Sequence, residues 1–179
     1  MPEEVRKKLE EKRIFAASKN ENGLTEKERH INKARKKFNS FDSEKWEKTY
    51  FDEETGGFVV TEKDRISLSK KSDNEFLKYI KEKGMNVTLA NNGYIIEHTN
   101  ESYDIRINDI KADLKKTAGS GNIEKYAKKA IREQGAEKVV FEFENNLKEI
   151  HTKLLKLNRD YGIHGYYYFS SNLDKVHEF

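Results

Sequence analysis

The sequence contains no cysteine, no long apolar run and no pattern typical of a secretion signal. The absence of cysteine excludes disulfide bonds, thiolate zinc sites and cysteine nucleophiles, and it suits a cytosolic setting. No apolar stretch approaches the roughly 18 residues of a membrane-spanning helix, and the start MPEEVRKKLEEKR is charged throughout. We therefore expect a soluble chain.

A large excess of one charge is also missing. The 35 basic and 32 acidic residues give a net charge of +3, so whole-chain electrostatics steers nucleic acid only weakly and any basic surface has to be local. Histidine clusters are missing too. His30, His98 and His177 have no companions at metal-ligand spacing, which argues against a histidine zinc site.

Composition and length indicate one folded domain with an appendage. Charged residues make up 37% of the 179 residues, near the polar limit of globular proteins, but 11% aromatic residues argue against wholesale disorder. Residues 1–45 are rich in Lys, Glu and Arg, carry a thin apolar stripe, and include a capping box from Thr25 to Glu28. We assign 1–45 to a helical arm or linker and 46–179 to an α/β domain.

The domain alternates between strand and helix patterns. Gly56-Gly57 predicts a hairpin over residues 50–60, and helical spacing predicts a helix over 73–83 that ends at Gly84. That helix is expected to turn four side chains inward: Phe76, Leu77, Tyr79 and Ile80. The further predicted elements are strands at 86–90, 94–97, 138–143 and 165–171, and helices at 123–134 and 146–162. This order indicates an α/β (α+β) fold, a mixed central sheet with flanking helices.

The stretch YDIRINDIKADLKK, residues 103–116, carries the most informative pattern. Asn108-Asp109 predicts a two-residue turn, which places Asp104 directly opposite Asp113 on the paired strand. Because side chains alternate along strands, one face is expected to be apolar: Tyr103, Ile105, Ile107, Ile110, Ala112 and Leu114. The other face is expected to be polar: Asp104, Arg106, Lys111, Asp113 and Lys115.

Two opposed carboxylates on a sheet repel each other, with Cβ atoms about 4.5–5.5 Å apart. A divalent cation held by both would offset the repulsion, and carboxylate oxygens suit magnesium or manganese. The alternative is a solvated strand face on which Arg106 and Lys111 neutralise the two aspartates through weak, exposed ion pairs.

Asp104, followed by Asp113-Leu114-Lys115 on the next strand and flanked by helices, resembles the core of the PD-(D/E)xK nuclease superfamily. The pattern over about residues 73–143, including Gln134-Gly135-Ala136, more particularly resembles the C-terminal toxin nuclease domains of contact-dependent growth inhibition and related mobile-element proteins. Tyr103 stands where the motif has proline, and Asp113 where glutamate is commoner.

The resemblance implies a PD-(D/E)xK-like fold and a metal-dependent endonuclease. Asp104 and Asp113 would hold Mg²⁺ or Mn²⁺, and Lys115 would position or help activate the attacking water. It also implies a nucleic acid substrate, with tRNA favoured and DNA open, a cognate immunity protein as partner, and action in the cytoplasm after delivery within a larger toxin or mobile-element protein.

Several further residues have both a functional and an ordinary interpretation. Glu97 is either a third metal ligand or a strand end facing water, and Gln134 either contacts substrate or satisfies carbonyls at a helix end. Glu75 is either a helix acid near the metal or the end of a capping box with Ser72. Five basic residues either contact phosphates or form the polar face of a helix: Lys116, Lys125, Lys128, Lys129 and Arg132.

Two other function classes remain compatible with the sequence. One is a non-catalytic accessory domain of a phage or mobile-element structural protein, which would not bind metal. The other is a metal-independent ribonuclease that uses His151 or His164 as general base and stacks nucleobases on the YYYF run at 166–169. Its activity would survive a chelator.

Overall fold

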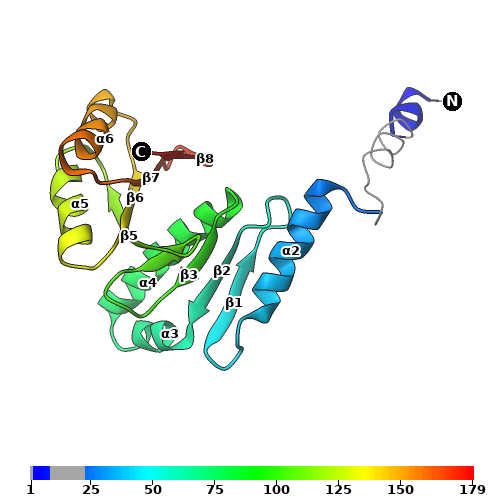
Figure 1. Ribbon diagram of the computed structural model, residues 1–179, viewed down its shortest axis with the longest axis horizontal. Helices are drawn as coiled ribbons and strands as arrows, with labels where there is room; N and C mark the ends of the chain where they lie inside the picture. The colour runs from blue at the N-terminus through cyan, green and yellow to red at the C-terminus, as the bar shows by residue number, and fades with distance from the viewer. Residues whose placement is uncertain (1, 9–22) are drawn as a thin grey trace.

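The computed structural model describes residues 2–8 and 23–179, whose strands form one mixed sheet in which β1 to β8 lie side by side in chain order (Figure 1). The strands are β1 (Trp46–Phe51), β2 (Phe58–Glu62), β3 (Ile95–His98), β4 (Ile105–Ile107), β5 (Ile110–Thr117), β6 (Lys138–Phe143), β7 (Gly165–Phe169) and β8 (Asn172–Glu178). Three neighbouring pairs are parallel, β2–β3, β5–β6 and β6–β7, and the other four are antiparallel. The predicted mixed α+β architecture is confirmed.

Helices cover both faces of the sheet, and those that follow β2 connect parallel strands. The helices are α2 (Glu26–Ser40), α3 (Lys63–Ser69), α4 (Asp73–Asn91), α5 (Ile123–Arg132) and α6 (Lys148–Tyr161). Each parallel pair needs a crossover connection, which α3 with α4, α5, and α6 supply in turn. None of the described helices is both long enough and apolar enough to cross a membrane.

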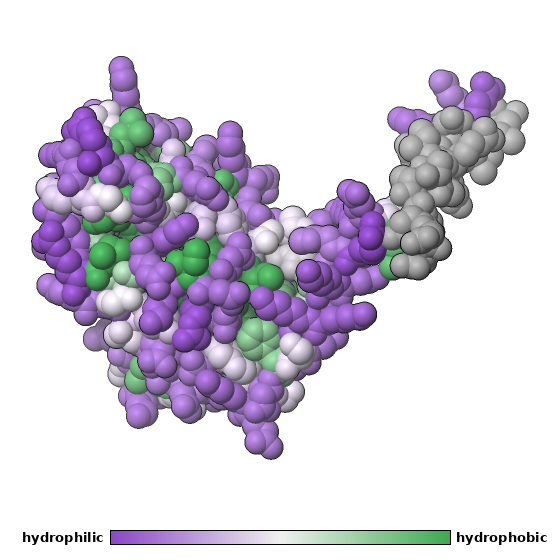
Figure 2. Space-filling model, viewed as in Figure 1, coloured by the Kyte–Doolittle hydropathy of each residue, from purple (hydrophilic) through white to green (hydrophobic). Residues whose placement is uncertain are grey.

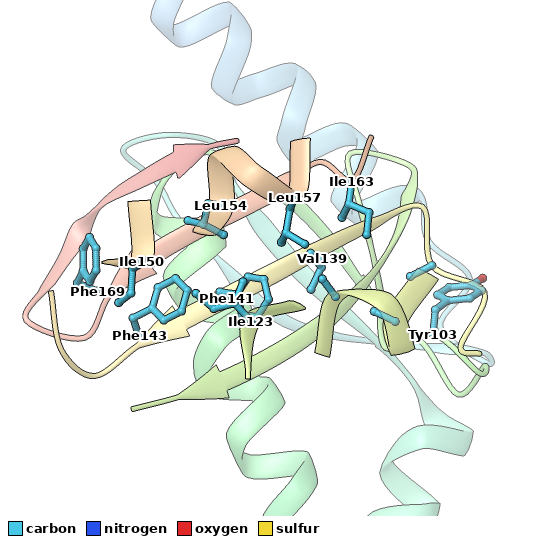
Figure 3. Packing of buried hydrophobic residues seen from close by; sticks show 13 residues of the cluster. Tyr103, Ile123, Val139, Phe141, Phe143, Ile150, Leu154, Leu157, Ile163 and Phe169 are labelled. Atoms are coloured by element: carbon cyan, nitrogen blue, oxygen red, sulfur yellow. The ribbon is translucent and has the colours of Figure 1, made fainter. Parts of the chain in front are cut away.

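Two apolar clusters lie on opposite faces of the sheet. On one face, side chains of α5 and α6 pack on Val139, Phe141 and Phe143 of β6 (Figure 3). On the other face, Met85 and Leu89 of α4 pack with strand residues that include Val140. Because β6 is covered on both faces, its sequence KVVFEF is nearly continuous in apolar residues, as expected of a central parallel strand.

Helix α2 packs against the β1–β2 end of the sheet (Figure 1). Its Phe38 joins a cluster with Trp46, Phe58 and Val60, and its first turn is capped by the Thr25 hydroxyl, which accepts a hydrogen bond from the amide of residue 28 at 3.0 Å. The second half of the predicted arm therefore contacts the sheet, whereas residues 9–22 lie outside the described part of the chain.

Helix α4 runs through Gly84, so the predicted helix end at Gly84 and the predicted strand at 86–90 are wrong. The chain continues in helical spacing because Met85 and Leu89 bury themselves against the sheet. The glycine that turns the chain is Gly93, whose φ is 93°. Burial of an apolar helical stripe has overridden the β-branched residues of NVTLA.

The inward face of α4 also differs from the prediction. Phe76, Leu77 and Ile80 are exposed to 50%, 64% and 46% of their surface, and of the four predicted inward side chains only Tyr79 is buried. The C-terminal half of the helix decides which side of α4 faces the sheet. Because the sequence predicts a strand at 86–90, it gives the wrong inward face for residues 73–83. Figure 2 shows apolar patches interrupting the largely hydrophilic surface in its view.

The C-terminal hairpin adds strand β8, which the sequence analysis did not predict; its tip is the turn between β7 and β8. The first hairpin is confirmed, with β1 and β2 antiparallel around Gly56 at a φ of 79°.

The correction at Gly84 leads to a test with two glycines. In Gly84→Ala the new methyl group meets no neighbouring atom, so we expect the free energy of unfolding to rise by about 0.5–1 kcal/mol, because alanine loses less entropy than glycine inside a helix. Gly162, the left-handed C-cap of α6, is the matched control. In Gly162→Ala we expect the free energy of unfolding to fall by about 1 kcal/mol, because alanine is strained in the left-handed conformation. Urea unfolding followed by circular dichroism measures both. A destabilised Gly84→Ala variant would contradict an uninterrupted α4.

Candidate functional site

The β4–β5 hairpin has the predicted turn and register. Asn108 and Asp109 both have positive φ, 47° and 69°, and Ile105 pairs with Ala112. Asp104 lies just before β4, where its Oδ2 accepts a hydrogen bond from the Leu114 amide at 2.9 Å. The hairpin therefore brings Asp104 beside the Asp113 region of β5, as the sequence predicted.

Tyr103 departs from the predicted apolar face. Ile105, Ile107, Ala112 and Leu114 pack in the cluster under α4, but Tyr103 packs in the cluster on the opposite face. The regular strand β4 begins only at Ile105, so the alternation that would place Tyr103 with Ile105 does not extend to it.

Asp104, which is half-buried, and Asp113, which is fully buried, form an acidic pair. Asp113 has no exposed surface, and neither of its carboxyl oxygens meets a well-aligned hydrogen-bond donor among residues 2–8 and 23–179. Burial raises the pKa of Asp104 to about 8, and the negative charges of Glu82 and Asp113 add to the effect. At neutral pH the Asp104 carboxyl group therefore retains a proton that it would lose in water.

Lys115 and Gln134 complete the same group. The Lys115 Nζ lies 3.0 Å from Asp113 Oδ2 and donates a hydrogen bond to Gln134 Oε1, also at 3.0 Å. Gln134 reaches this position because it lies just after the C-cap of α5, Glu133, and before Gly135, which turns the chain at a φ of 74°. Asp104, Lys115 and Gln134 line one pocket of about 250 Å³.

Glu82 of α4 lines the same pocket and was missed by the sequence analysis. It is 2% exposed, and its Oε1 accepts a hydrogen bond from Arg65 Nη2 at 2.9 Å and lies 3.1 Å from His98 Nε2. Burial opposes its ionisation, but His98 and Arg65 outweigh burial and lower the pKa of Glu82 to about 2. The Tyr79 ring stacks on His98 with centroids 5.6 Å apart, which holds this network against β3.

Glu82 could have been found in the sequence by extending the predicted helix to Asn91. With that continuation, Glu82 falls three residues after Tyr79 and three before Met85, on the buried stripe. The helix acid considered instead, Glu75, lies at the first turn, where its amide donates to the Ser72 hydroxyl at 3.2 Å. The capping interpretation of Glu75 is consistent with this contact.

The structure does not bring Glu97 to the group. Its register partner in β4 is Arg106, whose Nη1 lies 3.8 Å from Glu97 Oε1. Burial raises the pKa of Glu97, which the positive charge of Arg106 partly offsets. Arg106 and Lys111 both lie over the Tyr103 ring, and no ion pair joins either cation to Asp104 or Asp113 in the described part of the chain. They therefore do not neutralise the acidic pair.

The five predicted phosphate-binding residues separate in the structure. Lys116 lines the pocket, with its Nζ 3.5 Å from Glu142 Oε1. Lys128 instead pairs with Glu124 at 2.8 Å and lies over the Tyr161 ring. The remaining three are exposed along or at the end of α5 and do not line the pocket: Lys125, Lys129 and Arg132.

A second group of titratable side chains lies around Tyr167 of β7. The His151 Nδ1 is 3.4 Å from the Tyr167 hydroxyl, and the His177 ring stacks on Tyr167 with centroids 4.8 Å apart. His164 is exposed in the loop before β7 and is not part of these ring contacts.

The raised pKa of Asp104 gives a stability test with a defined sign. The folded protein binds this proton more tightly than the unfolded chain, so the stability it contributes is complete below about pH 4 and is lost as the pH rises through about 8. The Asp104→Asn side chain cannot ionise, so we expect the variant to be more stable than the parent at pH 9 in a chelator. Its Tm should rise by about 2–4 °C for each kcal/mol that ionised Asp104 costs the folded parent.

Thermal unfolding at pH 4.5, 7 and 9 checks this expectation, and the difference should shrink toward pH 4.5. Asp109→Asn, in the exposed turn of the same hairpin, is the matched control and should follow the parent. An Asp104→Asn variant that is less stable than the parent at pH 9 would show that the carboxylate is compensated after all.

No family model matches the chain, and no curated protein matches it. Among solved structures, it is similar to a chain of the CdiA-CT/CdiI toxin and immunity complex from Burkholderia pseudomallei, with 21% sequence identity and a TM-score of 0.44. The similarity covers 56% of this chain and 82% of that one.

Proposed function

We propose that the protein is a metal-dependent nuclease whose active site is the pocket at the β4–β5 hairpin. The observation that supports this proposal is the Asp104–Asp113 pair: Asp104 lines the pocket, and the fully buried Asp113 lies beside it with Lys115 at 3.0 Å. Two acids without an adequate set of cations are costly to bury, so a structural role alone does not account for them.

The residues fit a divalent cation with oxygen ligands. Among the residues that the structure describes, both Asp113 oxygens lack an aligned donor, and Asp104 is the acid in the pocket that forms no ion pair. No group of three His, Asp or Glu side chains is arranged for metal binding in the described ranges, and Glu82 is already engaged by Arg65 and His98. Two carboxylates, completed by water and phosphate oxygens, are typical of magnesium sites.

Each residue then has a specific task. Asp104 and Asp113 would hold Mg²⁺ or Mn²⁺, which supplies Lewis-acid polarisation of a phosphate oxygen and a more acidic water. Lys115, fixed between Asp113 and Gln134, orients the attacking water and offers positive charge to the phosphate. Lys116 at the pocket edge positions the neighbouring backbone phosphates.

The substrate and the biological context rest on the resemblance of the D…DxK pattern to toxin nuclease domains. RNA, in particular tRNA, is the favoured polymer, and DNA is the alternative because metal-assisted displacement serves both. A toxin of this kind acts in the cytoplasm of a target cell and is blocked by an immunity protein.

A second candidate function is a metal-independent ribonuclease, which the grouping of His151 and His177 around Tyr167 favours over a site at His164. Two imidazoles near one surface could serve as general base and general acid. Cleavage of RNA that survives a chelator and is lost in His151→Ala would identify that site instead.

The decisive test is cleavage of total tRNA and, in parallel, plasmid DNA with Mg²⁺ or Mn²⁺. We expect Asp113→Asn and Lys115→Gln to lower the rate by about a hundredfold or more, because the first weakens metal binding and the second removes the charge that orients the water. A chelator should abolish cleavage by the parent protein.

Glu97→Gln and Asp109→Asn are the controls and should cleave at the parent rate, since neither side chain lines the pocket. Cleavage that persists in Asp113→Asn would contradict this site. Absence of both cleavage and Mn²⁺ binding, measured by electron paramagnetic resonance, would favour the accessory-domain alternative.

A further inference from the structure

A groove of about 420 Å³ adjoins the catalytic pocket. Leu77 and Ile80 of α4 and Leu173 of β8 form its apolar wall. These three side chains are 64%, 46% and 47% exposed, and Phe76 extends the stripe one turn before Ile80. Exposed apolar side chains that gather along a groove, rather than lying scattered, are a feature of ligand-binding grooves.

The groove is continuous with the pocket. Lys81 of α4 and Lys116 of β5 line both, so the two hollows meet at these side chains. If the scissile phosphate of a nucleic acid lies at Asp104 and Asp113, the neighbouring nucleotides have to continue along the protein surface. The groove offers them a path that begins at the pocket. From Leu77 to Thr88 the helix provides about 16 Å, room for a few nucleotides.

The charges around the groove suit a polyanion. Lys78, Lys81 and Lys116 lie along the pocket and the junction. The acid that lines the groove, Glu142, accepts a hydrogen bond from the Tyr168 hydroxyl at 2.6 Å and lies 3.5 Å from the Lys116 Nζ. Glu142 is therefore compensated, and the rim is left basic.

We propose that this groove holds unpaired nucleotides next to the scissile phosphate, so that the enzyme acts on single-stranded segments rather than on continuous duplex. A duplex presents sugars and phosphates at its surface and keeps its bases stacked inside. Unpaired nucleotides offer the flat apolar faces of their bases to an apolar wall while their phosphates contact the lysine rim. The proposal rests on the proposed nuclease function, which places the scissile phosphate in the adjoining pocket.

The first experiment compares Mg²⁺-dependent cleavage of one labelled oligonucleotide as a single strand and annealed to its complement. We expect the single strand to be cut faster. Leu77→Ser and Ile80→Ser should raise the KM for the single strand roughly tenfold and leave kcat unchanged, because they remove apolar contact and touch no reacting group. Both positions are exposed, so the variants should fold normally.

Leu155→Ser on α6 is the matched control, an exposed leucine that does not line the groove, and it should behave as the parent. Equal cleavage of both substrates, or an unchanged KM in both groove variants, would overturn the proposal.

Fluorescence anisotropy with the same labelled strands separates this proposal from the nuclease function. If no polymer is cut, the nuclease proposal has failed, yet weaker single-strand binding by Leu77→Ser and Ile80→Ser would still support the groove. Unchanged binding would overturn the groove as a nucleotide site, and an apolar protein partner would be its remaining occupant.

Discussion

The burial of Asp113 beside Asp104 is the constraint on which the rest of the site depends. The left-handed conformations of Asn108 and Asp109 set the hairpin register, and the Leu114 amide then fixes the Asp104 carboxyl group. A slip of one residue would turn Asp113 to the opposite face of the sheet, where α4 packs. The tight turn is thus part of the site, although it lies at the far end of both strands.

Charge balance explains how three acids can share a small buried space. Glu82 is compensated by Arg65 and His98, and Asp113 by Lys115, at contact distances of 2.9 to 3.1 Å. Asp104 forms no ion pair within residues 2–8 and 23–179, and its raised pKa keeps it protonated at neutral pH. The fold therefore tolerates a group that weakens it at high pH, as expected where stability is exchanged for function.

The sequence was sufficient for the hairpin and insufficient for α4, for physical reasons. Asn108-Asp109 between alternating residues specifies a turn locally, and the spacing from Ile123 to Ile131 predicts the buried face of α5, although the helix ends at Arg132 and not at Gln134. Gly84, in contrast, fits a helix interior as well as a helix end, and only packing of Met85 and Leu89 on the sheet decides between them. Glu82 was missed with it, because its burial depends on that same packing.

Arg65 lies on α3, ahead of the stretch 73–143 that carries the nuclease-like pattern. A fragment cut at Asp73 would keep Glu82 but lose its guanidinium partner, and removing one side of a buried ion pair costs about 3–5 kcal/mol. The smallest fragment that keeps the proposed site compensated therefore has to begin upstream of α3. Transfer of the proposed site into another protein would depend on that boundary rather than on the motif alone.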